Sequence, residues 1–330
     1  MNPTFRSLLP LHPLPFSVGH SDKILCMGSC FAQHIGRRLQ AAKFDLRLNP
    51  FGILYNPASL QQGLRRLTTQ QPFGHQDLFE HQGQWHSFAH HSHFSALSAE
   101  AALEKINDAY EQGQQQLQSA QLLILTWGSA RVFRHLASYQ IVGNCHKLPA
   151  QAFTHELLSV AAITESWTAL LDQLRRYNPG LQVLLSISPV RHLRDGLIAN
   201  QRSKATLLLA AAQLEAAYDF VHYFPAYELL LDDLRDYRFY AEDLAHPNQL
   251  AVNYIWEYFK KAALKEESLA LLPQIERVQA AAAHRPFQPQ SPQHQAFIAK
   301  QLARIAELEQ QYNFLDFSPE KQQLRSTQSA

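Results

Sequence analysis

Residues 23–39 read KILCMGSCFAQHIGRRL and join two patterns of different period. Residues 23–27 are a short apolar run, typical of a strand that is buried on both faces. Over residues 31–39, apolar side chains recur every four positions, which is the period of a helix. Gly28-Ser29-Cys30 therefore lies between a strand and a helix. A hydroxyl or thiol there would lie beside unpaired N–H groups, which suits a nucleophile, an anion or an ordinary N-cap serine.

The composition excludes several classes of protein. The chain has 330 residues, of which 46% are hydrophobic and 17% charged, enough for a sizeable core. Its net charge of +1 argues against a nucleic-acid-binding protein, which usually carries a basic surface. The three cysteines are too few for a disulfide framework and indicate a reducing compartment, so we expect a cytoplasmic location. We expect no signal peptide and no membrane span, because prolines interrupt the N-terminus and no apolar stretch approaches ~20 residues.

The rest of the chain alternates between strand and helix patterns. Further apolar runs indicate strands at residues 43–48, 122–126, 183–187 and 218–224. Helical periodicity occupies residues 98–117, 154–177, 201–217 and 249–266. Such alternation indicates a parallel sheet that is covered by helices on both faces. We predict a doubly wound, three-layer α/β/α domain over residues 21–265, with a mostly parallel five-stranded sheet.

Two terminal segments differ from this central domain. Residues 1–20 contain four prolines and are interpreted as a lead-in. Residues 266–330 are rich in Ala and Gln, and the proline-rich stretch HRPFQPQSPQ interrupts them. We predict an accessory, partly flexible helical tail there, with one helix at about residues 294–312.

Two insertions interrupt the alternation of strands and helices. Residues 72–97 are expected to form a hairpin that turns at Gln82-Gly83, and residues 131–147 a second hairpin. The first insertion is rich in histidine, which could suggest a metal site: His75, His81, His86, His90, His91 and His93. No cysteine or HExxH pattern orders these side chains. We therefore predict no metal site and no organic cofactor.

Polar residues follow each predicted strand, at the sheet edge where open parallel sheets bind ligands. The five sequences are GSC, NPFG, TWGS, SPVRH and, past a helical stretch, DLAHP. In the last of these, Asp243 can hold one ring nitrogen of His246 while the other takes a proton from a nucleophile. The two residues could instead only cap the next helix. Their combination with Ser29 favours an active site.

Five sequence blocks strongly resemble the GSCFA family, which is named after the first: MGSCFA, NPFGILYNP, NCHKLP, SPVRHLRDG and RFYAEDLAHPNQLAVNYIWEYF. They occur in this order over about residues 20–260. The GSCFA family looks like a branch of the SGNH, or GDSL-type, hydrolases. The resemblance implies a serine esterase that removes acyl groups, often acetyl, from carbohydrates, lipids or small esters. Its catalytic residues would be Ser29, Asp243 and His246.

The stretch after the third predicted strand departs from the SGNH pattern, in which an Asn of Gly-x-Asn-Asp donates to the oxyanion hole. The corresponding positions here are Gly128-Ser129-Ala130-Arg131, without an amide. We assign the oxyanion hole to the backbone N–H groups of Ser29 and Gly52 and to the side chain of Asn144, which could also be a turn residue. Candidate substrate-binding residues are Gly128, His146, Arg191 and His192. Arg191 and His192 could instead only pack their loop.

Cys30 is the alternative nucleophile. It lies one residue deeper in the helix and would point about 100° away from Ser29. We interpret it as a small buried hydrophobe, although pairing with a histidine stays open. Three functions remain compatible with the residues. These are hydrolysis of a small-molecule or carbohydrate ester, acyl transfer by the same triad, and binding of a glycan or protein by a degenerate SGNH fold.

Overall fold

The computed structural model describes residues 7–326, so the first six residues of the lead-in and the last four of the tail lie outside it. The central sheet consists of five parallel strands: β1 (Ile24–Gly28), β2 (Leu46–Leu48), β5 (Leu122–Trp127), β9 (Gln182–Ile187) and β10 (Val221–Phe224). Their order is β10-β9-β5-β1-β2, a doubly wound order that reverses direction between β1 and β5. The predicted fold class is confirmed.

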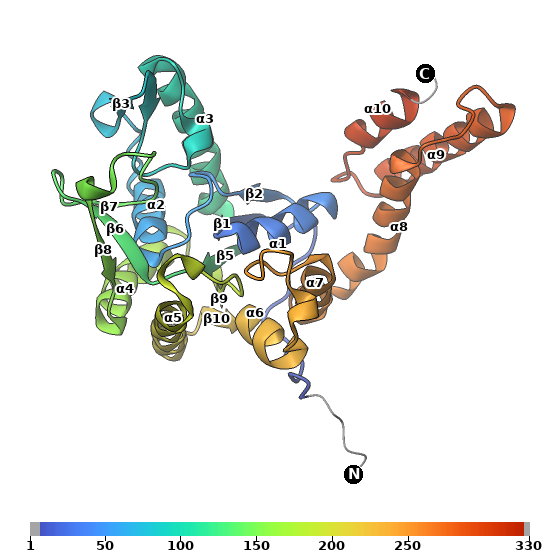
Figure 1. Cartoon of the computed structure of the whole chain (residues 1–330). Coiled ribbons are helices and arrows are strands. Elements are labelled where there is room, and N and C mark those ends of the chain that lie inside the picture. The colour runs from blue at the N-terminus through green and yellow to red at the C-terminus, as the bar shows by residue number, and fades with distance from the viewer. Residues whose placement is uncertain (1–6, 327–330) are drawn as a thin grey trace, which may run out of the picture.

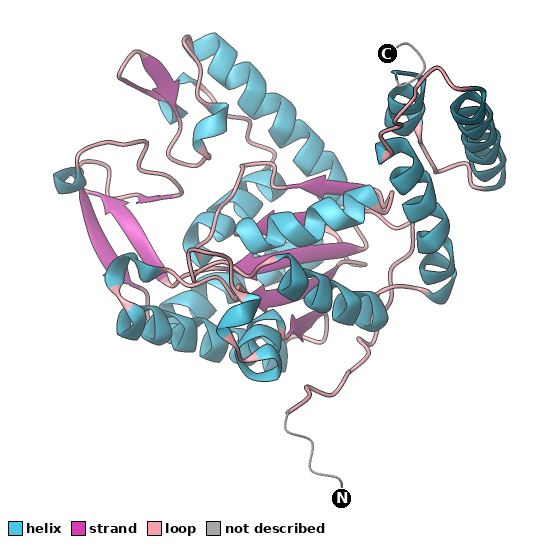
Figure 2. Ribbon diagram, turned by 45° about the vertical axis from the view of Figure 1, so that its right-hand side comes forward, coloured by secondary structure: helices cyan, strands magenta, loops and turns pink. Residues whose placement is uncertain are grey.

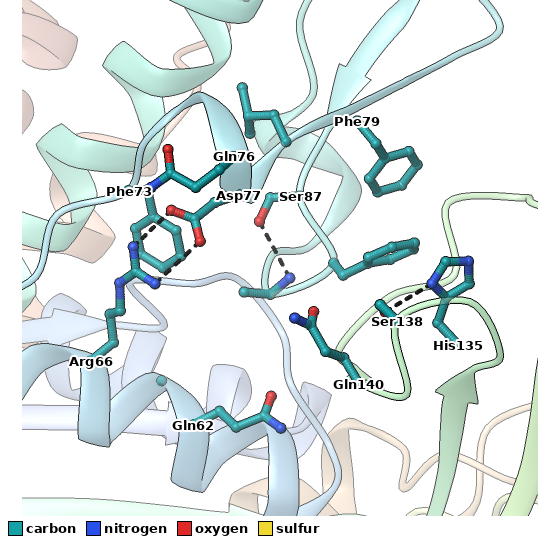
Figure 3. A pocket seen from close by; sticks show the side chains of 14 residues that line it. Gln62, Arg66, Phe73, Gln76, Asp77, Phe79, Ser87, His135, Ser138 and Gln140 are labelled. Carbon is teal, nitrogen blue, oxygen red and sulfur yellow. Dashed lines mark hydrogen bonds and ion pairs between the residues drawn. The ribbon is translucent and has the colours of Figure 1, made fainter.

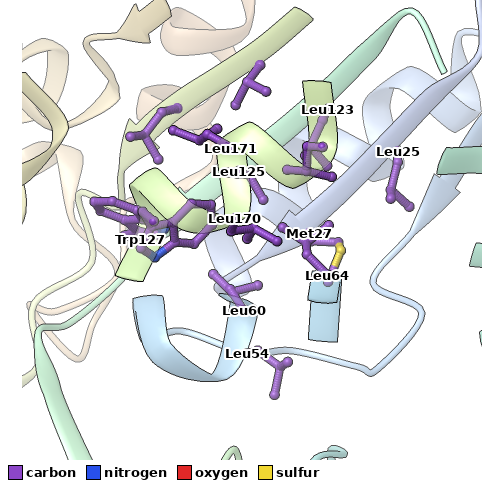
Figure 4. Close-up of a cluster of buried hydrophobic side chains, with 14 of the residues drawn as sticks. Leu25, Met27, Leu54, Leu60, Leu64, Leu123, Leu125, Trp127, Leu170 and Leu171 are labelled. Carbon is purple, nitrogen blue, oxygen red and sulfur yellow. The ribbon is translucent and has the colours of Figure 1, made fainter. Parts of the chain in front are cut away.

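Helices cover both faces of the sheet (Figures 1 and 2). One face carries α2 (Pro57–Thr69), α3 (Ala99–Ser119), α4 (Val160–Tyr177) and α5 (Leu197–Ala217). The other face carries α1 (Cys30–Ala41) and α7 (Gln249–Ala263). Successive side chains of β1 alternate between these two layers. Leu25 and Met27 join the core shown in Figure 4, whereas Ile24 and Cys26 join the opposite core. This alternation explains why the strand is apolar throughout.

Two small antiparallel sheets lie beside the main sheet. β3 (Phe79–His81) and β4 (Gln84–His86) form the first predicted hairpin. Its turn residues Gln82 and Gly83 have φ angles of 52° and 72°, as a type I′ turn requires. β6 (Arg131–His135) and β7 (Ile141–Val142) form the second hairpin, and β8 (Phe153–Leu157) pairs with the other side of β6.

The prediction of a helix from residue 154 was wrong at its start. The first residues of that range form β8, and the helix begins only after the N-cap Ser159. The sequence FTHEL alternates apolar and polar side chains, a strand period that the longer helical pattern behind it obscured. Helix α2 was not predicted at all. Short helices complete this part of the chain: η1 (His75–Asp77), η2 (Ser92–Phe94), η3 (Ala150–Ala152), η4 (Leu193–Asp195), α6 (Ala226–Glu228), the π-helix η5 (Leu229–Leu234) and η6 (Tyr237–Phe239).

The C-terminal tail contains three helices instead of the predicted one: α8 (Glu266–Ala283), α9 (Pro292–Gln311) and α10 (Ser318–Ser326). They extend to one side of the sheet domain (Figure 1) and share a separate apolar core that includes Ile275, Ile298 and Phe317. Helix α8 was missed because its pattern continues directly from α7 and contains Pro273. None of the helices within residues 7–326 has the length and hydropathy needed to cross a membrane.

Candidate active site

Ser29 lies where β1 ends and α1 begins, beside the point at which the strand order reverses. The preceding Gly28 has a φ of +149°, and a Cβ there would lie 2.5 Å from the carbonyl oxygen of Thr126, so only glycine fits. Ser29 is the N-cap of α1, and its Oγ accepts a hydrogen bond of 3.3 Å from the N–H of Phe31. That bond uses an oxygen lone pair and leaves the hydroxyl hydrogen available to a base.

Asp243 and His246 form a hydrogen-bonded pair in the turn before α7. Asp243 Oδ2 lies 2.6 Å from His246 Nδ1. Its Oδ1 accepts bonds of 3.0 Å from the N–H groups of Ala245 and His246. The two backbone bonds, followed by the bond to the imidazole, lower the pKa of Asp243 to about 2. The ionised carboxylate favours the proton on Nδ1 and leaves Nε2 as the basic nitrogen.

The cap of α7 is made by another residue. The side chain of Asn248 accepts a hydrogen bond of 3.1 Å from the N–H of Ala251. Asp243 and His246 are therefore not needed to cap the helix. The alternative that these two residues cap α7 is wrong.

Arg191, from the loop after β9, holds the Asp243–His246 turn against the end of the sheet. Its N–H donates to the carbonyl of Ala245 at 3.0 Å, and its guanidinium lies 4.2 Å from the ring centre of Tyr240. His192 is also near this turn. Burial lowers the pKa of His192 to about 4, and the charges of Lys204 and His246 act in the same direction.

Ser29 and His246 belong to the same end of the sheet, but no hydrogen bond joins them within residues 7–326. Ser29 is only 2% exposed, whereas the His246 side chain is 47% exposed. Catalytic hydrogen bonds are often long or absent without substrate and tighten in the complex. We refer to Ser29, Gly128, His192, Asp243 and His246 together as the Ser29 edge.

The backbone groups assigned to the oxyanion hole are occupied in this structure. The N–H of Ser29 donates to Thr126 at 3.2 Å, and that of Gly52 donates to Asn49 at 2.8 Å. Asn144 lies after β7, and its Oδ1 accepts a bond of 2.9 Å from the N–H of His146. Nothing in these contacts brings Asn144 to Ser29.

His146 packs against the first insertion. Its Nε2 lies 2.8 Å from the carbonyl of Ser87, and its ring centre lies 4.6 Å from that of His86. Burial lowers the pKa of His146 to about 4. Across residues 7–326, no three His, Cys, Asp or Glu side chains gather closely enough to hold a metal ion.

Asn49 supplies an amide that the sequence reasoning missed. Its Oδ1 accepts a bond of 2.9 Å from the N–H of Gly28, directly before Ser29. Its Nδ2 is buried and has no hydrogen-bond partner among the described residues. A buried donor without a partner is costly, and such groups cluster at functional sites. The signal in the sequence was the NPFG block itself, of which only Gly52 was used.

Lys204 was also missed. It reaches the end of the sheet from α5, is 1% exposed, and donates to the carbonyls of Gly128 and Ser188 at 2.5 and 2.6 Å. Burial lowers its pKa to about 7. No carboxylate within residues 7–326 forms an ion pair with it. The available signal was a lysine in register with the buried stripe of Leu207 and Leu214.

Gly128 has no room for a side chain. A Cβ there would lie 3.0 Å from His192 Nε2 and 3.0 Å from the Cβ of Tyr55. His192 Nε2 is buried and lacks a hydrogen-bond partner in the described part of the chain. The nitrogen can therefore accept or donate a hydrogen bond next to the end of β5.

Cys30 is the alternative nucleophile to Ser29. Burial raises the pKa of its thiol and disfavours the nucleophilic thiolate.

Comparison with protein families identifies the chain. A model described as the GSCFA family matches residues 23–259. The chain belongs to the GSCFA family. A second model, described as the C-terminal domain of GSCFA domain proteins, matches residues 275–328, and the part of this match up to residue 326 lies in the three-helix tail. The resemblance inferred from the five blocks is thus confirmed, and the tail is also a recognised part of GSCFA proteins.

Solved structures show only a distant similarity to this GSCFA protein. A family 3 carbohydrate esterase from Clostridium thermocellum is 11% identical with a TM-score of 0.34, covering 77% of this chain and 98% of that one. The acetyl xylan esterase Est2A from Butyrivibrio proteoclasticus is 12% identical with a TM-score of 0.36, covering 80% of this chain and 66% of that one. A search of curated proteins gave no match.

Proposed function

We propose that this GSCFA protein is a serine esterase in which Ser29 is the nucleophile, His246 the general base and Asp243 the residue that orients it. The observation that carries the proposal is the 2.6 Å bond from Asp243 to His246 Nδ1, at the sheet edge where Ser29 starts α1. The pair has no capping duty, since Asn248 caps α7. This arrangement has the roles of a Ser-His-Asp triad.

The proposed reaction has two steps. His246 Nε2 takes the hydroxyl proton of Ser29, and Oγ attacks the carbonyl carbon of the ester. The tetrahedral intermediate expels the alcohol, which receives the proton from the imidazolium. Water, deprotonated by His246, then attacks the acyl carbonyl carbon. The second tetrahedral intermediate breaks its bond to Ser29 Oγ, which takes the proton back from the imidazolium, and the carboxylic acid is released. Ser29 must turn its Oγ away from the cap of α1 to begin this sequence, because Oγ accepts from Phe31 in the substrate-free protein.

Asn49 is our candidate for the missing oxyanion donor. The N–H groups of Ser29 and Gly52 already donate to backbone carbonyls, whereas Asn49 Nδ2 has no partner among the described residues. Its amide is anchored through Oδ1 to Gly28, next to the nucleophile. Lys204, buried behind Gly128, adds a positive potential that favours an oxyanion below about pH 7, where it is protonated.

A small acyl group such as acetyl suits this site best. Ser29 is 2% exposed, and Gly128 cannot accommodate even a Cβ without moving Tyr55 or His192. The alcohol portion would extend toward His246, whose side chain is half exposed. His192 and Arg191 line this outer side. A carbohydrate ester or another small ester is the proposed substrate class.

Labelling by a fluorophosphonate probe tests the nucleophile. The purified protein should be labelled on Ser29, and labelling should be lost in Ser29→Ala and His246→Ala. Cys30→Ala should be labelled like the wild type. Ser98→Ala provides a control for loss of a cap, because Ser98 caps α3 with a 3.2 Å bond from Ala101. Persistent labelling of Ser29→Ala would exclude Ser29 as the nucleophile.

Two other activities are separable by experiment. Acyl transfer to a sugar uses the same acyl-enzyme, so p-nitrophenyl acetate should be tested with and without sugar acceptors. A degenerate binding module is favoured by one observation, the engagement of both expected backbone donors, Ser29 and Gly52. Such a module would turn over no ester and would bind its ligand equally well as Ser29→Ala.

A further inference from the structure

A second cavity lies away from the Ser29 edge, between α2, residues 73–89 and the β6–β7 hairpin (Figure 3). We call it the α2 cavity; its volume is about 430 Å³, and its lining includes Gln62, Phe73, Gln76, Phe88, His135 and Gln140. Small-molecule sites usually fall between about 300 and 1,000 Å³. No residue of the Ser29 edge lines it.

Among the described residues that line the α2 cavity, only Arg66 and Asp77 carry a full charge, and they neutralise each other. Arg66 binds the carboxylate of Asp77 through two nitrogens, at 3.2 and 2.8 Å. Its remaining donors reach the carbonyls of Gln71 and Pro72, each at 2.7 Å. These four bonds use four of the five guanidinium N–H donors and leave one Nη1–H, too few for the paired hydrogen bonds by which arginine holds a phosphate or carboxylate. A charged ligand would therefore find no counter-ion here.

Several uncharged polar side chains at the cavity have hydrogen-bonding groups that no other described residue uses. The side chains of Gln62, Gln76 and Gln140 are exposed at the cavity, and their amides make no hydrogen bond with any residue between 7 and 326. In Figure 3, Gln62 extends from α2 and Gln140 from the loop after β6 into the same space. His135 is oriented by a 2.9 Å contact between Nδ1 and Ser138 Oγ, which leaves Nε2 available. Amides offer both donors and acceptors, the combination that hydroxyl groups match.

Aromatic rings form the apolar part of the wall. Phe79 and Phe88 stack with ring centres 4.2 Å apart, and Phe88 also lies 4.8 Å from the His135 ring. An apolar chain would pack on these rings, but it would displace water from the exposed amides without replacing their hydrogen bonds. A ring with apolar faces and hydroxylated edges satisfies both. We propose that the α2 cavity binds a neutral saccharide ring.

The proposed saccharide site does not depend on the triad. Helix α2 begins next to the Ser29 edge, where the carbonyl of Tyr55 accepts bonds from Gly128 and Ser129. Gln62 lies five residues beyond Pro57, about 8 Å along the helix at 1.5 Å per residue. A saccharide in the cavity would thus lie beside the ester site without entering it. The site would hold a sugar even in a protein that hydrolyses no ester.

Saturation-transfer NMR and isothermal titration on the full chain test the proposal. The probes are the neutral sugars N-acetylglucosamine, xylobiose and maltose, with glucuronic acid and glucose 6-phosphate as charged counterparts. We expect at least one neutral sugar to bind and the charged ones to bind more weakly. Gln62→Trp should fill the cavity and weaken binding at least tenfold. The matched control is Gln112→Trp, the same exchange at an exposed position of α3 that does not line the cavity.

Several results would overturn the proposal. These are no binding of any neutral sugar, equal binding by Gln62→Trp and wild type, or tighter binding of the charged sugars. Ser29→Ala separates the two sites, because it should retain saccharide binding while losing esterase activity. Loss of sugar binding in Ser29→Ala would place the sugar in the ester site and contradict the α2 cavity.

Discussion

The Ser29 edge and the α2 cavity treat charge in opposite ways. At the Ser29 edge, Lys204 is buried without a carboxylate partner within residues 7–326, and Asp243 is kept ionised by three hydrogen bonds. In the α2 cavity, Arg66 and Asp77 neutralise each other. A site that develops charge during a reaction gains from preorganised charges and dipoles, whereas a site that only binds a neutral ring does not. The contrast separates a proposed reaction site from a proposed binding site within one domain.

The largest expected difference between the two sites is in catalysis. Hydrolysis of p-nitrophenyl acetate should fall by about 10⁴-fold or more in Ser29→Ala and His246→Ala, because each removes a triad member. Gln62→Trp, in the α2 cavity, should leave the rate unchanged. Ser98→Ala should also keep its activity while losing about 1 kcal/mol from a helix cap. A Ser29→Ala protein with the wild-type rate would remove the distinction between the sites.

The second largest effect is expected from Asn49, the proposed donor to the oxyanion. Asn49→Ala and Asn49→Asp should lower kcat by about 10²–10³-fold with little change in KM, since one transition-state donor is lost. Asn49→Asp keeps an oxygen for the N–H of Gly28 and removes only the donor. Asn144→Ala is the control and should retain the wild-type kcat. If Asn144→Ala were the impaired variant, the donor would be Asn144, as the sequence suggested.

The buried Lys204 should make the free energy of unfolding depend on pH between about pH 7 and 10. Its pKa is about 7 in the folded protein against 10.5 when exposed, so the unfolded chain binds more protons between these values. The free energy of unfolding should therefore rise with pH, by up to about 4 kcal/mol from pH 7 to 10. Urea unfolding should show this rise in the wild type and in Lys300→Met, at an exposed position of α9. Lys204→Met should lack it, and a rise of equal size in that variant would contradict the assignment.

His90, which is buried behind the α2 cavity, should make the free energy of unfolding depend on pH in the acidic range, by less than Lys204 does in the alkaline range. Its ring contacts Phe73 and its Nδ1 lies 2.9 Å from Ser87 Oγ, and burial lowers its pKa to about 3. Below pH 6.5 the unfolded chain binds the extra proton, so the free energy of unfolding should fall by about 2 kcal/mol down to pH 5. His90→Phe should flatten this part of the urea-unfolding profile, whereas His284→Phe, at an exposed position, should not. Identical slopes in all three proteins would show that His90 is not the titrating group.

Local patterns were predicted from the sequence with good accuracy. The strand before Ser29, the glycine turn and the N-cap are encoded by neighbouring residues, as is the turn at Gln82-Gly83. Helix α8 was missed because it follows α7 almost without a break, and β8 because the longer helical pattern of α4 behind it obscured its alternation. The β8 error concerns a boundary, where the local signal is weakest, whereas α2 and α8 were missed as whole elements.

The sequence by itself determined that the polar residues after the parallel strands lie at one edge of the sheet, because strands are recognised by short-range periodicity and parallel strands share one direction. It also determined the spacing of Asp243 and His246, which lie three residues apart. Only the tertiary structure decided which side chains lack partners. Asn49 lies beside Gly28 because β1 and β2 pair, and Lys204 reaches Gly128 because α5 packs over β9. The α2 cavity likewise joins residues separated by more than 70 positions. Hydrogen-bond satisfaction and burial depend on such long-range neighbours, which no local pattern specifies.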